Sequence, residues 1–365
     1  MDFKNILICP DKFKGSMTAT EFCEIAKKQA KKIFKTAEIN CIPTADGGEG
    51  SLIFFANQTK AKFIEGIYFD SNFKEIKAKF ALKDDVAFVE LAQTSGLEIT
   101  KQKNPRITTT FGLGQQISSA LKFGAKTIYI SIGGSSTNDA GCGMACALGY
   151  KFFDKNNRTF VPTGDTIVQI NRIEKPELPS DVKFIALCDV KNVLFGKNGA
   201  AYVYAKQKGA TEQDIEVLDK NLMFFNNLCK QQGFDFSKVE GAGAAGGVGA
   251  GLQFFLGAKL CGGLTTLLNL SGADNIINNA DLIISGEGKI DKQSLCGKVV
   301  FALHEKCKGK FVAFCGENNL KSSDYDFDII EINKPNDSLK KSIRKTKSNL
   351  KSALKKYFVA LQNDR

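Results

Sequence analysis

The sequence predicts an α/β protein made of two domains. Short apolar strands alternate with helical segments along most of the chain. A length of 365 residues also exceeds what one hydrophobic core comfortably serves. Glycine clusters follow the predicted strands, where the backbone can approach a ligand closely, in "DGGEGS" (46–51), "IGGSSTNDAG" (132–141), "GAGAAGGVGAG" (241–251) and "SGEGKID" (285–291).

The N-terminal elements follow from apolar spacing. We expect a buried strand at 5–10 and a helix at 18–34, with Thr18 or Thr20 as N-cap and Glu21 in the first turn. A strand at 38–43 and a short helix at 51–58 come next. Two alternating strands, 62–70 and 75–82, are separated by polar residues and predict a hairpin.

The later elements continue this alternation. Strands are predicted at 86–92, 127–132 and 183–189, and a helix at 109–124 closes on Gly124. The C-terminal part predicts strands at 281–286, 310–316 and 327–332 and helices at 297–307 and 338–361. Neither chain end alone supplies a full sheet, so 1–74 and 271–365 are predicted to combine, with 75–270 inserted. A ligand is expected in the cleft between the two domains.

The composition excludes several protein classes. With 43% hydrophobic and 24% charged residues the chain is globular, and no run reaches the ~18–20 apolar residues of a membrane helix. The few residues before the first strand are too short for a signal sequence, which predicts a cytoplasmic protein. The 11 cysteines include no CxxC pair and are expected to be free thiols.

The net charge of +11 owes much to the last predicted helix. Its lysines surround an apolar stripe of Leu339, Ile343, Leu350, Leu354 and Phe358, which favours a solvated face. A basic nucleic-acid-binding protein is the alternative. Arginine is scarce in this helix, and no aromatic side chains interleave with the lysines to stack on bases.

The stretch "SIGGSSTNDAGCGMACALGY" (131–150) joins a strand to a small-residue helix. Backbone N–H groups, hydroxyls and the positive end of a helix dipole would together suit phosphate oxygens. An ordinary helix cap made by Ser, Thr, Asn or Asp explains the same residues. The sequence alone leaves both interpretations open.

The segment "GAGAAG" satisfies GxGxxG, which would indicate a nicotinamide-dependent oxidoreductase. Its context argues against a dinucleotide, because no convincing strand precedes it and no acidic residue lies about 20 positions on. No GxxxxGK[ST] sequence is present either. Any phosphate site must therefore be built without a P-loop.

Seven motifs in order resemble the bacterial type-I glycerate kinases: "PDKFKGS", "ADGGEGS", "NPRITTTFGLG", "IGGSSTNDAGCGM", "LCDVKNVLFGKNGAA", "GAGAAGGVGAGL" and "SGEGKIDKQSLCGK". The resemblance covers residues 8 to about 316. It implies two α/β domains, one flavodoxin-like with a parallel sheet from both chain ends, and phosphorylation of D-glycerate by ATP and Mg²⁺, usually at the 2-hydroxyl. Lys12, Arg106 and Lys289 depart from the family, which more often has serine, an aliphatic residue and arginine there.

Phosphoryl transfer to an alcohol needs a proton acceptor and donors around the phosphates. The only histidine, His304, lies in an apolar helix and is not a ready base. Asp189, at the end of a predicted strand, is the favoured base, with an N-cap as the alternative. The glycine turns are assigned to the nucleotide, through Gly133, Gly134, Ser135, Ser136, Thr137, Asn138, Gly243, Gly246 and Gly247.

Magnesium needs hard oxygen ligands, and the candidates are Asp46, Glu49, Asp139, Glu287 and Asp291, with Asp291 and Asp46 favoured. Lys14 is expected to reach the transferred phosphate. The small acid is assigned to Lys12, Thr94, Ser95 and Arg106, although Thr94 and Ser95 also fit a simple turn. The expected partners are D-glycerate and ATP, with neither nucleic acid nor membrane, and the chain is expected to be a monomer or homodimer.

Overall fold

The computed structural model describes residues 3–13, 15–44, 50–270, 272–292, 294–296, 299–334 and 337–363. The chain forms two compact units. Unit 1 combines Met1–Asp46 with Leu267–Arg365, and unit 2 is Gly47–Thr266. No helix in the described part of the chain is long and apolar enough to cross a membrane.

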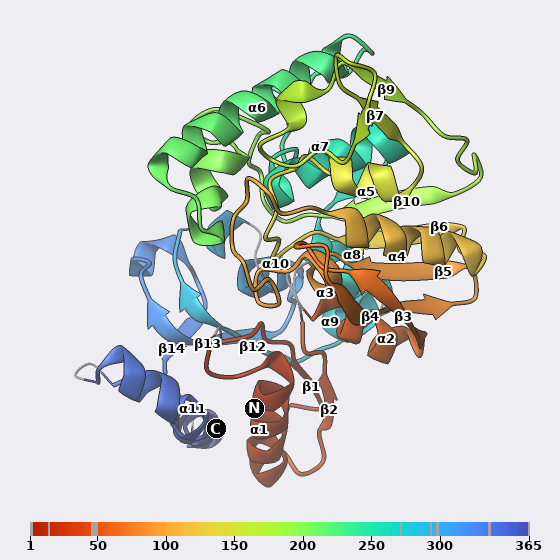
Figure 1. The fold of residues 1–365 in the computed structure, drawn as a ribbon. Helices are drawn as coiled ribbons and strands as arrows, with labels where there is room; N and C mark the ends of the chain where they lie inside the picture. Colours follow the sequence, from red (N-terminus) through yellow and green to blue (C-terminus); the bar gives the residue numbers. More distant parts are fainter. Residues whose placement is uncertain are drawn as a thin grey trace. The chain divides into compact units, whose positions relative to one another are not determined.

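The sheet of unit 1 has five parallel strands in the order β14-β13-β12-β1-β2 (Figure 1). Numbered along the chain within this unit, the order is 2-1-3-4-5, which is the flavodoxin-like arrangement. Strands from both chain ends therefore share one sheet, as the sequence predicts. The strands are β1 (Asn5–Ile8), β2 (Glu38–Cys41), β12 (Leu282–Ile290), β13 (Lys310–Asn318) and β14 (Asp328–Glu331).

Two helices lie side by side over one face of this sheet, α1 (Ala19–Ile33) and α11 (Leu339–Asn363). Thr18 and Glu21 form a capping box that begins α1. Lys347 near the start of α11 bonds Glu21 at 2.5 Å. Phe358 near its end meets Phe34, with ring centroids 5.5 Å apart. The two helices therefore run parallel. The remaining helices of the unit are α9 (Ala273–Asn278), α10 (Val299–Lys306) and the short 3₁₀ turns η4 (Ser294–Cys296) and η5 (Ser322–Asp324), and α8 (Gly263–Leu270) spans the boundary.

The predicted apolar stripe of α11 is correct only from Leu350 onward. Leu339 is 76% exposed, and Ile343 is also exposed. The buried positions in the first turns are instead Ser342 and Thr346, and the hydroxyl of Thr346 donates to the carbonyl of Ser342 at 3.0 Å. Backbone bonding of this kind lets a polar side chain occupy the inner face.

A second correction concerns "SGEGKID". The sequence predicts a glycine-rich turn from 285, whereas β12 continues to Ile290. Parallel pairing with β13 extends through Ile290↔Asn318. Because β13 pairs with this extension residue by residue, pairing outweighs the preference of glycine for turns.

The sheet of unit 2 has the order β11-β10-β6-β5-β4-β3. Its first four strands are parallel, and the β3–β4 hairpin adds antiparallel strands. Because β3 pairs along its length with β4, the division predicted at 74/75 is wrong, and the boundary lies at 46/47. The strands are β3 (Lys62–Phe69), β4 (Glu75–Lys83), β5 (Val86–Glu90), β6 (Thr127–Ser131), β10 (Lys183–Leu187) and β11 (Lys259–Cys261).

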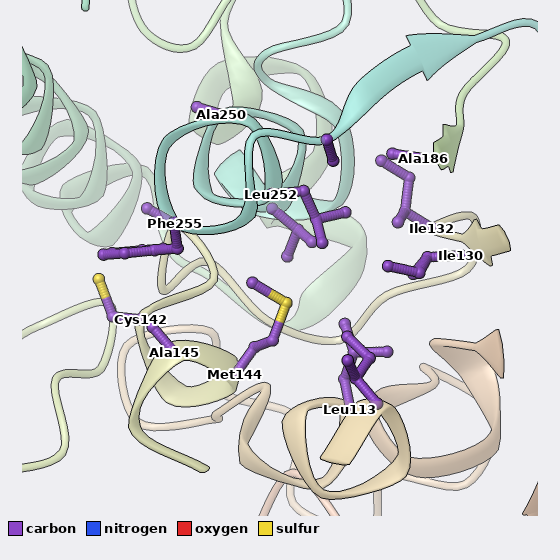
Figure 2. Packing of buried hydrophobic residues seen from close by; sticks show 14 of the residues in the cluster. Leu113, Ile130, Ile132, Cys142, Met144, Ala145, Ala186, Ala250, Leu252 and Phe255 are labelled. Carbon is purple, nitrogen blue, oxygen red and sulfur yellow. The ribbon is translucent and has the colours of Figure 1, made fainter. Parts of the chain in front are cut away.

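The core of unit 2 lies between this sheet and a helical layer. Figure 2 shows Leu113, Met144 and Leu252 from three helices facing Ile130 and Ala186 of the sheet. The other sheet face receives α2, where Phe55 stacks on Phe88 with centroids 4.9 Å apart. The helices are α2 (Ser51–Thr59), α3 (Ala92–Ser95), α4 (Phe111–Lys122), α5 (Cys142–Ala147), α6 (Glu212–Lys230) and α7 (Ala244–Leu256).

Several elements of unit 2 have no counterpart in the sequence prediction. A small antiparallel sheet has the order β8-β7-β9. Helix α6 is the longest helix of this unit, and a single π-helical turn precedes it. These elements are β7 (Lys151–Phe153), β8 (Thr159–Phe160), β9 (Arg172–Glu174), η1 (Ile167–Gln169), the π-helical η2 (Ala201–Ala205) and η3 (Lys206–Lys208). The ten cysteines named in the described chain are all free thiols.

Candidate active site

Several predicted site residues of unit 2 follow the carboxyl ends of its parallel strands. The strands β5, β6, β10 and β11 are parallel, so their carboxyl ends lie at the same edge. Glu90 ends β5, and Thr94 and Ser95 lie in α3, the next element along the chain. The polar run begins at Ser131, the last residue of β6, and Asp189 follows β10. Ligands of α/β sheets bind at such an edge.

The polar run after β6 turns most of its side chains inward. Residues 135–139 are buried, whereas Gly134 is exposed and has a left-handed φ of 74°. In the described chain, the backbone N–H groups of Gly133 and Gly134 donate no hydrogen bond. The Gly133–Gly134 turn is therefore the part of the run that stays open to a ligand.

Asp139 explains the start of α5. Its carboxylate accepts from the N–H and hydroxyl of Thr110, both at 2.8 Å, and from the N–H groups of Gly141 and Gly143, both at 3.2 Å. Complete burial raises the pKa of Asp139, although these hydrogen bonds act in the opposite direction. The capping interpretation therefore accounts for this carboxylate, whose oxygens already serve four protein donors.

Some polar atoms of the run have no partner. Among the described residues, the hydroxyls of Ser131 and Thr137 and both amide atoms of Asn138 make no hydrogen bond. These atoms are buried, where an unpaired polar group costs roughly 1–3 kcal/mol. The segment is thus under-bonded around Thr137 and Asn138.

Ser95 is bonded to the same run, and Thr94 directly precedes it. The carbonyl of Ser95 accepts from both the N–H and the hydroxyl of Ser136, at 2.9 and 3.0 Å. The two predicted hydroxyls are buried and bond within the protein. Ser95 donates to the Thr109 carbonyl at 3.2 Å, and Thr94 donates to Gln116 at 3.4 Å.

The glycines of 241–251 pack against protein backbone. A Cβ at Gly246 would lie 2.1 Å from the carbonyl oxygen of Thr137, and one at Gly243 would lie 2.1 Å from that of Val193. Gly247 is buried against Ala140. The backbone of Gly246 and Gly247 is left-handed inside α7. Close packing therefore requires glycine here, and the nucleotide role of Gly243, Gly246 and Gly247 stays a prediction.

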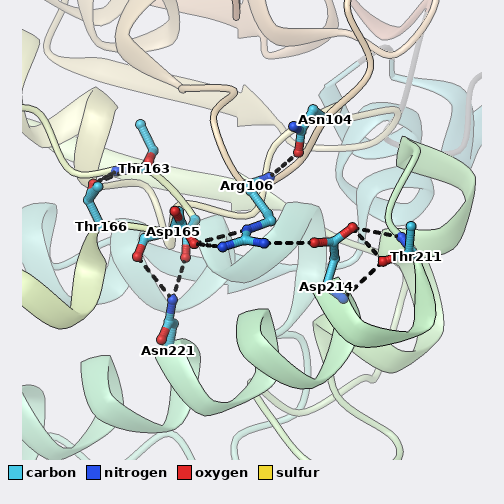
Figure 3. A network of polar contacts seen from close by, with 9 residues as sticks. Asn104, Arg106, Thr163, Asp165, Thr166, Thr211, Asp214 and Asn221 are labelled. Carbon is cyan, nitrogen blue, oxygen red and sulfur yellow. Dashed lines mark hydrogen bonds and ion pairs between the residues drawn. The ribbon is translucent and has the colours of Figure 1, made fainter.

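Arg106 is held by two carboxylates (Figure 3). Its guanidinium pairs with Asp165 and, at 3.0 Å, with Asp214. These hydrogen bonds, that to Asp165 first, raise the pKa of Arg106. The predicted contact with an anionic substrate would have to compete with both carboxylates. Asp165 is fixed in turn because its carbonyl accepts from Asn221 at 3.3 Å.

Further candidates lie in unit 1, at the carboxyl ends of β1 and β12. Strand β1 lies between β2, the next strand along the chain, and β12. The strand order therefore reverses between β1 and β12, and such a reversal is a topological switch point. Glu287 lies on β12 and is buried, and Asp291 directly follows that strand. The half-buried Lys12 follows β1. Lys14, Asp46 and Glu49 lie outside the described residues.

The sequence argument missed three charged residues near these edges. Asp11 is buried, and its N–H donates to the carbonyl of Gly286 at 2.8 Å, which places it beside Glu287. Glu90 is also buried and accepts from the N–H of Leu52 at 2.8 Å, at the start of α2. Both follow or end a strand, a signal that the sequence does contain. Lys208 is 2% exposed, and nothing in "KQKGA" distinguishes it from a solvated lysine.

His304 is partly buried in α10, as predicted, with 28% of its side chain exposed. Its Nε2 lies 3.4 Å from a carboxylate oxygen of Asp326. In the described parts of both units, no group of three or more His, Cys, Asp and Glu side chains is arranged to hold a metal. Lys289, on β12, pairs with Glu317 on β13 at 3.4 Å.

Comparison with known proteins agrees with this architecture. The model of the glycerate kinase family matches residues 6–362. A glycerate 2-kinase of Escherichia coli (strain K12) is 40% identical over 306 residues, covering 80% of this chain and 79% of that protein. A glycerate kinase of Bacillus cereus (strain ATCC 10987 / NRS 248) is 39% identical over 311 residues, covering 83% and 82%. A crystal structure described as glycerate kinase 2 from Salmonella typhimurium LT2 matches with a TM-score of 0.84 and 30% identity, over 99% of both chains. This chain belongs to the glycerate kinase family.

Proposed function

We propose that the protein transfers the γ-phosphoryl group of ATP to D-glycerate and forms mainly 2-phosphoglycerate. The observation that carries this proposal is the family match over 6–362, nearly the whole chain. The preference for the 2-hydroxyl is supported by 40% identity to a protein named glycerate 2-kinase.

The Gly133–Gly134 turn is our proposed contact for phosphate oxygens. It is the exposed end of a run whose other residues are buried, and its N–H groups donate no hydrogen bond within the described chain. Backbone N–H groups at a strand end suit phosphate because they bring donors without bulk. Ser95 and Ser136 are bonded to each other beside this turn, and the N–H of Leu97 donates to the Gly134 carbonyl at 2.8 Å.

The carboxylates at the switch point of unit 1 fit a magnesium ion. Magnesium takes one or two carboxylates and otherwise water and phosphate oxygens, and it neutralises phosphate charge when bound. Glu287 and Asp291 offer hard oxygen donors at the carboxyl end of β12, and Asp11 lies beside Glu287. We therefore propose Glu287 and Asp291 as ligands, with Asp46 and Glu49 retained as predictions outside the described residues.

Asp189 is the proposed acceptor of the glycerate hydroxyl proton. It is half-buried at the carboxyl end of β10, and a carboxylate is sufficient because little proton transfer precedes a loose transition state. Lys12 and Lys14 follow β1 and are proposed to hold anionic groups of the substrates. Binding of both substrates between the two units stays a prediction.

The oxidoreductase alternative needs a strand directly before the "GAGAAG" segment, and the structure does not have one among the described residues. In a dinucleotide fold, GxGxxG joins a strand to a helix. The described residues 234–243 before α7 contain no strand, and the glycines that follow pack on backbone.

A phosphorus NMR experiment tests the proposal. The purified protein is mixed with ATP, Mg²⁺ and D-glycerate, ADP release is followed, and the product is examined in a proton-coupled ³¹P spectrum. A phosphate on the 2-carbon couples to one proton and gives a doublet, whereas one on the 3-carbon couples to two and gives a triplet. Absence of ADP would reject the kinase, and a triplet would reject the 2-phosphate. Light scattering under the same conditions distinguishes a monomer from a homodimer.

A further inference from the structure

A buried lysine ammonium forms hydrogen bonds with the polar run. Lys208 ends η3 and is 2% exposed. Its Nζ donates to the hydroxyl of Ser135 at 2.8 Å and to the carbonyl of Thr137 at 2.7 Å. Lys206, two residues earlier, is exposed and pairs with Glu212 at 2.8 Å. The two lysines of one short turn therefore occupy opposite environments.

Burial makes this ammonium costly. Removal from water lowers the pKa of Lys208 to about 7, and the charge of Asp139 acts in the opposite direction. Asp139 lies in the polar run itself and is the ionisable group that acts on Lys208 among the described residues. An apolar side chain of similar length would fill the space without this cost. Packing alone therefore gives no reason for an ammonium here.

The segment that Lys208 contacts needs external support. Its middle residue, Ser136, bonds the Ser95 carbonyl and accepts from the hydroxyl of Thr108 at 2.9 Å. The following polar side chains, Thr137 and Asn138, find no partner in the described chain. Lys208 forms hydrogen bonds with Ser135 and Thr137, the residues on either side of Ser136.

We propose that Lys208 is a positioning residue for nucleotide binding, which holds Ser135 and Thr137 so that the adjoining Gly133–Gly134 turn presents its N–H groups to phosphate. This inference rests on the proposed function, because it names the group that orders the proposed phosphate contact. The ammonium touches the turn's neighbours and acts through them. A preordered turn binds an anion without first losing backbone freedom.

Hydrogen exchange tests the structural half without any assay of activity. The variant Lys208→Met keeps the length of the side chain and removes the ammonium, and Lys206→Met is the matched exposed control. We expect amides of 131–138 to exchange about tenfold faster or more in Lys208→Met and at the parental rate in Lys206→Met. Equal exchange in parent and Lys208→Met would overturn the inference.

Kinetics and calorimetry test the nucleotide half. In Lys208→Met we expect the KM for ATP to rise about fivefold or more, with the KM for D-glycerate within about twofold of the parent. Unchanged constants, or an equal rise in both, would reject a positioning role. Should the parent release no ADP, the proposed function fails, and calorimetric titration of ATP into both proteins still decides the role of Lys208. Should Lys208→Met not fold, Ser135→Ala removes one of the two bonds and must weaken ATP binding for the inference to stand.

Discussion

The carboxylate of Asp189 accepts a hydrogen bond of 2.8 Å from the backbone N–H of Gly263. This bond joins the end of β10 to the first residue of α8. Asp189 therefore does cap a helix, as the alternative interpretation requires. The capped helix is α8, and not the turn that directly follows Asp189. A carboxylate at the start of a helix is stabilised by the helix dipole.

Asp189→Asn separates these roles. Loss of a general base should lower kcat by about 10²–10⁴, with ATP affinity little changed. Asparagine caps about as well as aspartate, so a capping residue should leave kcat within about threefold. A lost magnesium ligand should instead be partly rescued by raised Mg²⁺. Steady-state rates at two magnesium concentrations decide, and a rate within about threefold of the parent removes Asp189 from the mechanism.

Gly134→Ala and Gly246→Ala should behave differently, although the sequence gives both glycines the same role. A Cβ at Gly134 meets only Ala92 at 3.9 Å, so strain at its left-handed φ is the main cost, about 1–2 kcal/mol. The protein should fold and show a raised KM for ATP. A Cβ at Gly246 would lie 2.1 Å from the Thr137 carbonyl oxygen, so that variant should be strongly destabilised. Thermal unfolding and the KM for ATP are measured, and equal stability of the two variants would contradict this account.

Asp139→Ala should destabilise unit 2 severely. It leaves four donors, from Thr110, Gly141 and Gly143, without their acceptor in a buried region. The expected loss in the free energy of unfolding is about 3–5 kcal/mol, measured by urea denaturation. Asp181→Ala is the control, because Asp181 is exposed and its pair with Lys126 should matter little. A similar small change in both variants would show that the buried network is not needed for stability.

The pH dependence of stability should reveal Lys208. An unfolded lysine keeps its proton up to about pH 10.4, whereas the folded pKa is about 7. Between these values the unfolded state binds more protons, so the free energy of unfolding rises with pH, by at most about 1.4 kcal/mol per unit. Below pH 7 both states are charged and this slope vanishes. Urea denaturation at pH 7, 8 and 9 should give parent and Lys208→Met curves that diverge, and parallel curves would refute the burial of a titrating ammonium.

Arg106→Met tests whether this arginine serves structure or substrate. Because the guanidinium already pairs with Asp165 and Asp214, we expect a modest loss of stability and a KM for D-glycerate within about threefold of the parent. A KM for D-glycerate raised about tenfold or more, with stability unchanged, would restore the substrate role given by the sequence.

Local sequence patterns predict those elements that are determined by residues close together along the chain. Thr18 caps α1 and the hairpin turn follows β3, because capping and turn chemistry involve residues a few positions apart. The extension of β12 through "SGEGKI" could not be predicted in this way. That segment is a strand because it pairs with β13, which lies some 20 or more residues away along the chain.

The site shows the same limit. Its strand-end residues, such as Asp189, are visible in the sequence because a polar residue directly after an apolar strand is a local signal. The burial of Lys208 and the packing role of Gly246 are not, since their surroundings come from the distant run 135–139. A lysine in a polar turn and a glycine in a glycine-rich stretch look ordinary until that run packs against them.

The strand order of unit 1 determines when its sheet can form during synthesis of the chain. The β1 strand lies between β2, which ends at Cys41, and β12, which begins at Leu282. At ribosomal speeds, roughly 10–50 s pass between the synthesis of β2 and that of β12, because the whole of Gly47–Thr266 is made between these two strands. Unit 2 can therefore fold on the ribosome before β12 is available to complete the sheet of unit 1.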